Sequence, residues 1–345
     1  MKRLTTYIIC LLVFTLTSCD KTVLEFPEGE GADPTLVNLT LNFEVDPQIV
    51  PYSSGGSSEA SETDWDDVRW IVEVFRDEIS GEPVEKRILS SEQAADGHHK
   101  IQTNLSLHAA RYHIVTWADY VNNGSTADKY YIVNSLASIK IPENGKYIGN
   151  EDYKATYVAK QEVDLRNYAD QWNETVNTTV TLRLPMAKIE FITTDIDKFL
   201  DEQAGRREKM GNNTDNALQK VDLSKIQIQV EYAGFFPSGF NVYTNKPNDA
   251  RMGVYFECFM KPLTNKEAHL ASDYIFVNGS ESAVKVNLII RDVDGTLLNK
   301  VENINVPIVR GKLTTIRDEF LTRNYAPGIG ISPDFDGEIN VVIPD

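Results

Sequence analysis

Alternating hydrophobic and polar residues mark most of this chain as β-structure. The clearest run covers residues 37–45, where Val37, Leu39, Leu41, Phe43 and Val45 alternate with polar residues. A period of two places these apolar side chains on one face, so it predicts a half-buried antiparallel strand. Shorter runs of the same kind predict further strands at residues 68–75, 86–89, 100–107, 112–117, 130–133, 157–165 and 178–184.

The second half of the chain continues this pattern after one interruption. Residues 195–210 predict a short helix, with Asp195 or Asp197 as its N-cap and the Gly-Asn-Asn sequence at 211–213 as its end. Strands are then predicted at residues 226–232, 241–243, 254–259, 274–277, 284–290, 301–306, 312–316 and 339–343. Many short strands separated by turn residues predict an all-β protein of two tandem β-sandwich domains, with the helix near the start of the second.

The N-terminal residues have the pattern of a secretory signal. Lys2 and Arg3 precede an apolar run at 7–16, and Ser18 stands directly before Cys19. The apolar run falls short of the ~20 residues that a membrane-spanning helix requires. The pattern resembles the bacterial lipobox, so we predict that Cys19 is lipidated and becomes the first residue of the mature protein. The alternative is an ordinary signal peptide followed by a cysteine without lipid.

Composition changes along the chain give a domain division. After the signal, a segment with Pro27, Gly29 and Gly31 lacks a sustained apolar period and cannot bury enough surface to fold. The predicted divisions are a signal peptide at 1–18, a flexible tether at 19–33, an N-terminal β-sandwich at 34–174 and a C-terminal β-sandwich at 175–345.

Charge and cysteine content restrict the partners. The net charge of the 345-residue chain is -17, and removal of the basic signal makes it about -19. A surface this acidic repels phosphate backbones, which excludes nucleic acid, and it gives no attraction to anionic lipid, so membrane attachment depends on the acyl chains. Cys258 is the one cysteine besides Cys10 and Cys19, so the mature chain forms no internal disulfide; its apolar surroundings predict a core position.

The residues carry no catalytic or metal-binding signature. The histidines lack metal-ligand spacing, and His98-His99 follow Asp96-Gly97 in a predicted solvated turn. Asp292–Gly295 is similar to the start of a calcium loop but lacks the later bidentate glutamate, so a hairpin turn is the better interpretation. Asp334 and Asp336 also predict a turn. No Gly-x-Ser-x-Gly motif occurs. We therefore predict no enzyme activity, no catalytic residues, no metal site and no cofactor.

Tryptophans are the residues that leave a ligand-binding role open. Trp65, Trp70, Trp117 and Trp172 are the side chains on which a sugar ring could stack. Trp70 and Trp117 lie within predicted strands and are interpreted as core. Trp65, in an acidic serine-rich loop, is the one candidate for an exposed ligand contact.

Several longer motifs resemble the Bacteroidales fimbrillin-like lipoproteins. They are TLRLPMAKIEFITTD at 181–195, GFFPSGFNV at 234–242, SDYIFVNG at 272–279, NVPIVRGKLTTI at 305–316, GIGISPDFDG at 328–337 and the run 107–120 that ends in WADY. The resemblance implies two transthyretin-like β-sandwich domains in a surface-exposed, lipid-anchored protein of the outer membrane. It also implies a role in fimbriae as a stalk, tip or anchor subunit, with other fimbrial subunits as partners joined by β-strand addition, and with host or glycan ligands.

The segment after the first strand bears on the type of subunit. In related polymerising subunits, cleavage after a basic residue removes the first strand, but residues 46–68 contain no Lys or Arg and Arg69 lies within the next predicted strand. We therefore expect the first strand and the Cys19 anchor to be retained, as in an anchor or accessory subunit. The candidate strand-exchange residues are Val37, Leu39, Leu41, Phe43, Val45, Ile339, Val341 and Ile343. The alternatives are a glycan-binding surface lipoprotein and an exported hydrolase.

Overall fold

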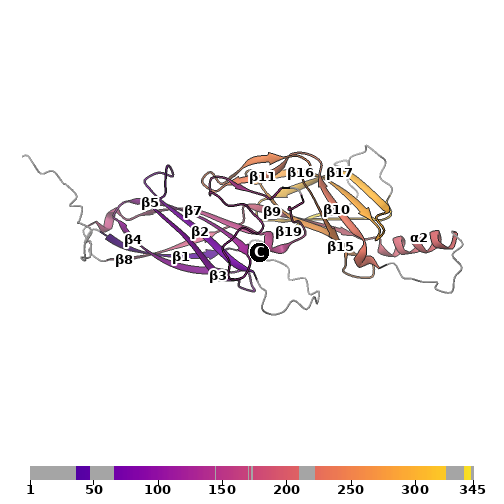
Figure 1. Cartoon of the computed structure of the whole chain (residues 1–345), viewed down its shortest axis with the longest axis horizontal. Helices are drawn as coiled ribbons and strands as arrows, with labels where there is room; N and C mark the ends of the chain where they lie inside the picture. The colour runs from indigo at the N-terminus through magenta and orange to yellow at the C-terminus, as the bar shows by residue number, and fades with distance from the viewer. Residues whose placement is uncertain are drawn as a thin grey trace, which may run out of the picture.

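The computed structural model describes residues 36–46, 66–143, 145–169, 171, 174–209, 222–323 and 338–342. They form two β-rich halves that lie end to end (Figure 1). The prediction of an all-β protein with tandem β-sandwiches and a short helix in the second half is confirmed.

The first sandwich consists of a three-stranded and a four-stranded sheet. The sheet orders are β4-β1-β8 and β3-β2-β5-β7. The strands are β1 (Leu36–Val45), β2 (Asp67–Arg76), β3 (Glu85–Glu92), β4 (Lys100–His108), β5 (Arg111–Val121), β7 (Thr156–Asp164) and β8 (Thr175–Leu182). Trp70 packs against Phe43 of β1, and Trp117 packs against Tyr131 and against Phe276 of the second half. Both are fully buried, which confirms their interpretation as core.

The second sandwich consists of a four-stranded and a five-stranded sheet. The orders are β13-β10-β16-β17 and β14-β15-β9-β18-β19. The strands are β9 (Met186–Thr193), β10 (Gln227–Tyr232), β13 (Tyr255–Phe259), β14 (Lys261–Pro262), β15 (Ala268–Phe276), β16 (Glu281–Arg291), β17 (Leu297–Val309), β18 (Leu313–Asp318) and β19 (Glu338–Val342). The turn at 292–296 joins β16 to β17, as predicted, with Gly295 at a φ of 82° that favours glycine.

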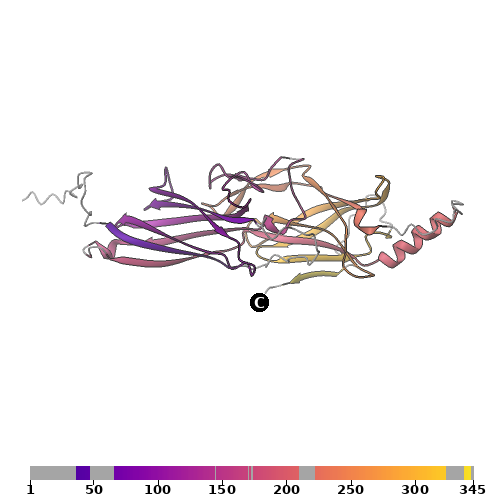
Figure 2. The same ribbon diagram turned by 60° about the horizontal axis from the view of Figure 1, so that its bottom comes forward.

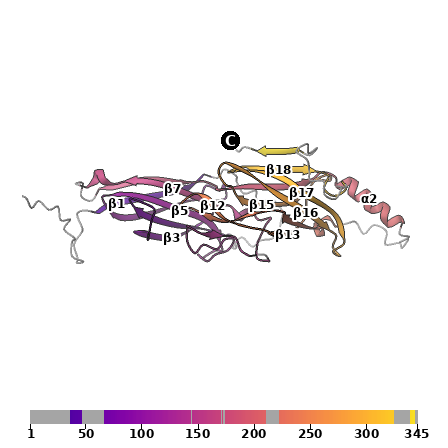
Figure 3. The same cartoon turned by 90° about the horizontal axis from the view of Figure 1, so that it is seen from above.

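The two sandwiches repeat one arrangement around a central strand. In the first, β1 is antiparallel to β4 and parallel to β8. In the second, β9 is antiparallel to β15 and parallel to β18. β19 then pairs antiparallel with the far side of β18, at the edge of the sheet, where Figure 3 shows it as the yellow arrow beside β18.

A third, small sheet connects the halves. Its order is β12-β11-β6, from β6 (Ile139–Lys140), β11 (Phe236–Asn241) and β12 (Lys246–Arg251). β6 lies in the long connection between β5 and β7 of the first sandwich, whereas β11 and β12 belong to the second half of the sequence. The halves are therefore interleaved and not joined by a simple linker.

Helix α2 (Ile196–Lys209) projects from the end of the molecule away from the first sandwich (Figure 2). Asp195 is its N-cap, because the backbone carbonyl of Asp195 accepts the first helical bond from the N–H of Phe199 at 2.9 Å. Within the described residues, no helix has the length and apolar character needed to cross a bilayer.

Three sequence interpretations differ from the structure. The strand predicted at residues 241–243 is a turn that begins after Asn241, the last residue of β11. Residues 130–133 form an isolated bridge at Ile132 and not a strand, because Tyr130 and Tyr131 pack into the core of the connection between the sandwiches. His99 is buried and not solvated; its ring accepts a hydrogen bond from the N–H of Ala94 at 2.9 Å and contacts the Tyr120 hydroxyl at 2.8 Å.

The proposed domain division is affected by one pairing. β8 begins at Thr175, the first residue of the predicted C-terminal domain, yet it pairs with β1. This pairing is a reason to propose that the first domain continues to the end of β8.

Candidate strand-exchange site

β1 is the central strand of its sheet. Its backbone is paired along its length, with β4 on one side and with β8 on the other. The five apolar residues of the predicted pattern are at most 2% exposed; they are Val37, Leu39, Leu41, Phe43 and Val45. Burial of each large side chain of this kind stabilises the fold by about 1.5–3 kcal/mol. The candidate residues of β1 are therefore part of the core.

Arg69, the first basic residue after β1, is held in a buried ion pair. Its side chain is 4% exposed and donates to both carboxylate oxygens of Asp119 at 2.9 and 2.6 Å, while Nη1 lies 2.8 Å from Asp128. Burial opposes the charge of Arg69, but the carboxylates of Asp119 and Asp128 outweigh it, and the pKa of the guanidinium is raised. A trypsin-like protease must bind an exposed basic side chain on a backbone that is free to enter its cleft. The Arg69 side chain is buried, and the β2 backbone around it is paired with β3 on one side and β5 on the other.

Among the described strands, β19 differs from β1 in having one neighbour. Its register places Ile339 opposite Ile316 and Val341 opposite Thr314 of β18. It is five residues long and forms the edge of its sheet. Ile339 and Val341 thus lie on a strand that could leave the sheet without breaking a second ladder of backbone hydrogen bonds.

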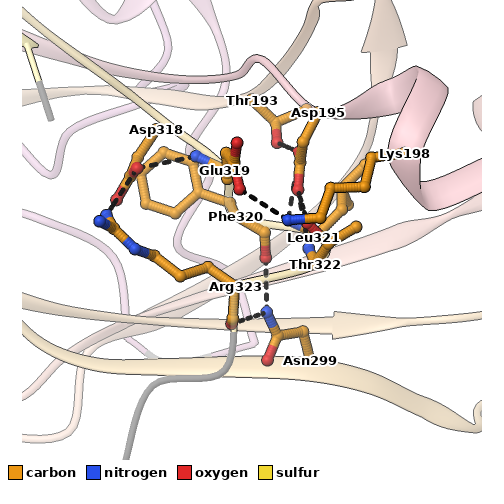
Figure 4. A network of polar contacts seen from close by, with 10 residues as sticks. All are labelled: Thr193, Asp195, Lys198, Asn299, Asp318, Glu319, Phe320, Leu321, Thr322 and Arg323. Carbon is orange, nitrogen blue, oxygen red and sulfur yellow. Dashed lines mark hydrogen bonds and ion pairs between the residues drawn. The ribbon is translucent and has the colours of Figure 1, made fainter.

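A polar network fixes the chain just before the C-terminal segment (Figure 4). The Asp195 carboxylate accepts hydrogen bonds from the backbone N–H of Thr322 at 2.7 Å, from its hydroxyl at 2.8 Å and from the Thr193 hydroxyl at 2.5 Å. Asn299 donates to the carbonyl oxygens of Phe320 and Arg323 at 2.7 and 3.1 Å. We call this network the C-terminal latch. It attaches residues 320–323 to the start of α2 and to β17.

A buried cluster joins the two sandwiches. Lys154 and Asp273 form an ion pair at 2.5 Å with side chains at most 2% exposed. The hydroxyls of Tyr147 and Tyr232 each donate to the same Asp273 carboxylate oxygen at 2.5 Å. Burial lowers the pKa of Lys154, an effect that Asp273 opposes, and burial beside Asp273 raises the pKa of both tyrosines, which keeps them protonated as donors. The sequence analysis missed this cluster because its members lie up to 126 positions apart.

A polar hollow of about 800 Å³ opens at the end of the first sandwich. Its lining includes Asp66, Asp67, Ser90, Ser91, Glu92, Gln93, Asn123, Gly124, Ser125 and Thr126. Asp66 is paired with Lys129 at 2.5 Å, and Asp67 accepts the N–H of Gly124 at 2.8 Å. These lining side chains include no aromatic ring on which a sugar could stack.

Three predicted site residues, Cys19, Trp65 and Ile343, lie outside the described residues, as do Asp334 and Asp336. Their roles stay predictions. Cys258 is partly buried at the core; its thiol lies 3.2 Å from the Leu270 carbonyl, and burial raises its pKa to about 12, which keeps it protonated and unreactive. Among the described residues, no group of three or more His, Cys, Asp or Glu is placed to hold a metal ion.

A family model matches residues 32–344, from before β1 to beyond β19. It describes a family of unknown function, DUF6562. The chain belongs to this family. The comparison with curated proteins gives no match.

This DUF6562 member is similar to several solved structures. One is the fimbrial anchor protein Mfa2 from Porphyromonas gingivalis, with 11% identity, a TM-score of 0.41 and coverage of 88% of this chain and 95% of that one. Another is a fimbrial assembly protein from Parabacteroides distasonis, with 13% identity, a TM-score of 0.40 and coverage of 88% and 99%. A third is a proposed polysaccharide-binding protein from Bacteroides thetaiotaomicron, with 12% identity, a TM-score of 0.45 and coverage of 81% and 90%. Fimbrial proteins are the group that the sequence motifs resemble, and likenesses of this size do not decide a function.

Proposed function

We propose that this protein is a structural lipoprotein of the bacterial outer membrane that serves as an anchor or accessory subunit of a fimbrium. Cys19 carries the lipid, β1 is retained in the mature chain, and subunits are joined by addition of a β-strand. The observation that carries the proposal is the position of β1, hydrogen-bonded on both sides and buried, with the first basic residue after it sequestered in an ion pair.

The repeated strand arrangement indicates where a strand would be added. β19 covers the outer side of β18, but among the described strands the corresponding side of β8 has no partner. The exposed residues of β8 are polar, namely Thr175, Asn177, Thr179 and Thr181. An unpaired strand edge is a template for main-chain hydrogen bonding with another chain. A strand like β19 from a neighbouring subunit would complete the first sandwich as β19 completes the second.

The anchor role is tested by locating the mature N-terminus of the protein shaved from intact cells. Trypsin should release the wild-type protein by cutting after Lys21, because no other Lys or Arg lies between Cys19 and Arg69. The released protein should therefore still contain β1. A mature N-terminus between residues 46 and 68 on unshaved cells would contradict the proposal.

The tether is tested with the Cys19→Ala variant. We expect the fimbriae of these cells to be shed into the medium. Cys258→Ser is the control: it changes a cysteine that carries no lipid, so the fimbriae should stay attached. Fimbriae that stay on Cys19→Ala cells in wild-type numbers would exclude the anchor role.

Strand addition is tested with a disulfide between β18 and β19. Leu313 and Val342 are register partners, so a Leu313→Cys/Val342→Cys variant would lock β19 to its own sheet. We expect the oxidised variant to lose subunit association and the reduced variant to regain it, with each single variant as control. Normal association of the locked form would exclude β19 as the exchanged strand.

A further inference from the structure

Aromatic side chains stand exposed on the outer face of β13. Tyr255 is 38% exposed and Phe259 is 58% exposed, whereas Phe256 between them is buried in the sandwich at 4%. The alternation along β13 therefore sends Tyr255, Glu257 and Phe259 to the outside. Two exposed aromatic rings on one strand face offer flat apolar surfaces on which a ligand can stack.

Polar side chains of β10 lie directly beside these rings. The register places Glu231 opposite Tyr255, Gln229 opposite Glu257 and Gln227 opposite Phe259.

Two hydrogen bonds order the polar groups. Gln227 donates to Glu257 at 3.1 Å, and Gln229 donates to Glu231 at 2.8 Å. One N–H of each glutamine amide is thus used within the face, and the carboxylate and amide oxygens lie between the rings as hydrogen-bond acceptors. Acceptors of this kind suit a ligand that is rich in O–H donors.

The spacing suits an extended chain and not a single small molecule. Tyr255 and Phe259 are four residues apart on a strand, which places them about 13 Å from each other. Two further exposed apolar side chains, Phe235 and Met252, lie next to the register pair Phe236–Arg251, directly before β11 and directly after β12.

The charge of the face disfavours anionic ligands. Aromatic faces are electron-rich and attract the weakly positive C–H groups of a pyranose ring, as they do other positive edges. Glu231 and Glu257 repel carboxylates and sulfates, as does the chain's net charge of -17. A linear polysaccharide without charge offers both the C–H faces and the hydroxyl donors.

We propose that the outer face of β13 and β10 is a binding site for a neutral polysaccharide chain. Tyr255 and Phe259 stack on sugar rings, and Glu231, Gln229 and Glu257 accept hydrogen bonds from hydroxyl groups between them. This site lies on the second sandwich and is independent of lipid attachment, of the retention of β1 and of strand addition.

Affinity gel electrophoresis of the full mature chain tests the site, with xylan, glucomannan and mixed-linkage β-glucan as neutral probes and polygalacturonate as the anionic probe. We expect retardation by a neutral polysaccharide and none by polygalacturonate. Phe259→Ala and Tyr255→Ala should each weaken the binding about tenfold, the loss of one stacking contact with its buried area. Ile88→Ala, which removes a side chain that is 53% exposed on β3, is the matched control and should bind as wild type does.

Both aromatic substitutions are at exposed positions, so the variants should keep the wild-type circular dichroism. No retardation by any of the three neutral polysaccharides would overturn the proposal, and so would binding that survives the double variant. Stronger binding to polygalacturonate would overturn the charge argument. Self-association that disappears in Phe259→Ala would assign the face to a second copy of the chain and equally overturn the glycan site.

Discussion

In the first sandwich β1 lies between β4 and β8, and in the second sandwich β9 lies in the same way between β15 and β18. The two sheets then differ on one side. β18 carries β19 on its outer edge, whereas β8 has no neighbour there among the described strands. The central strands are the common part of the two sandwiches, and β19 is an addition to the second.

This difference separates strands that build a sandwich from a strand that only extends one. β1 and β9 each have two backbone ladders and a buried row of side chains, so their loss would expose a core. β19 has one ladder of five register pairs. A strand intended for exchange between subunits needs the second kind of attachment, because exchange requires that it leave without unfolding its own sheet.

The largest expected effect comes from truncating a side chain on either central strand. Phe43 of β1 and Phe191 of β9 are each 1% exposed. Phe43→Ala and Phe191→Ala should each lower the free energy of unfolding by about 3–5 kcal/mol, because a cavity remains where the ring was. Val341→Ala on β19, the contrasting variant, removes fewer atoms from a strand with one backbone ladder and should lower it by less than either. Denaturant unfolding measures all three.

A loss at Val341 equal to that at Phe43 would remove the distinction between central and added strands. A loss at Phe43 much smaller than at Phe191 would instead show that β1 is the weaker of the two central strands, and would favour its exchange over that of β19.

The alternation of Val37 to Val45 predicted β1 correctly because its burial follows the sequence period, except at Thr40, which is buried at 7% exposure and bonds Asn104. Strands without that pattern were not predicted. β12 reads Lys-Pro-Asn-Asp-Ala-Arg and β14 has two residues, so backbone pairing with β11 and β15 defines them and their side chains do not. The parallel pairing of β1 with β8 was also beyond the sequence pattern, which indicates a buried face but not a neighbour.

Much of the site depends on contacts between residues far apart in sequence. That Arg69 lies in a strand was predictable, but its pairing with Asp119, 50 positions away, was not. The C-terminal latch joins Asp195 to Thr322 across 127 positions. The sequence did contain one signal for the latch, which is Asp195. It was predicted as a helix cap, and a cap carboxylate that does not bond its own helix is available to another segment.

A smaller effect, confined to the first sandwich, should appear with pH. Burial lowers the pKa of His99 from 6.5 to about 4, with His98 adding to the shift and Asp96 opposing it. The His99 carbonyl accepts the N–H of Val45 at 2.9 Å, which links this histidine to the end of β1. Between pH 6.5 and 4 the unfolded chain binds the proton and the folded chain does not, so stability falls as the pH falls through this window, by about 3 kcal/mol in total.

The measurement is the difference in unfolding free energy between wild type and His99→Gln at several pH values. The carboxylates of the chain titrate in both proteins and cancel, so the wild type should lose more stability than the variant as the pH falls from 6.5 to 4. Equal slopes for the two proteins would show that the folded His99 accepts a proton as readily as the unfolded one.

Removal of the C-terminal latch should have a local effect in the second sandwich. Asp195→Ala leaves the N–H and hydroxyl of Thr322 without their acceptor, which should cost about 1–3 kcal/mol. Hydrogen exchange should accelerate at residues 319–323 and in β19 while β1 is unchanged. Asp222→Ala removes an exposed carboxylate that caps a short 3-10 helix through Ser224, and should leave exchange in β19 as in wild type. Unchanged exchange in β19 after Asp195→Ala would show that the latch does not hold this strand.

The smallest effect is expected from ending the chain at Arg323, which removes β19. β18 keeps its six register pairs with β9, so the truncated protein should still unfold cooperatively. Its free energy of unfolding should fall by less than about 2 kcal/mol. Each lost backbone hydrogen bond contributes about 1 kcal/mol net, and the conformational entropy that the released segment regains offsets this loss. Its second sandwich then ends at an open β18, as the first ends at β8. A peptide of residues 324–345 should bind the truncated chain saturably by pairing with that edge, and a scrambled peptide should not. If truncation instead abolishes the cooperative transition, β19 is as integral as β1, and the exchanged strand must be sought elsewhere.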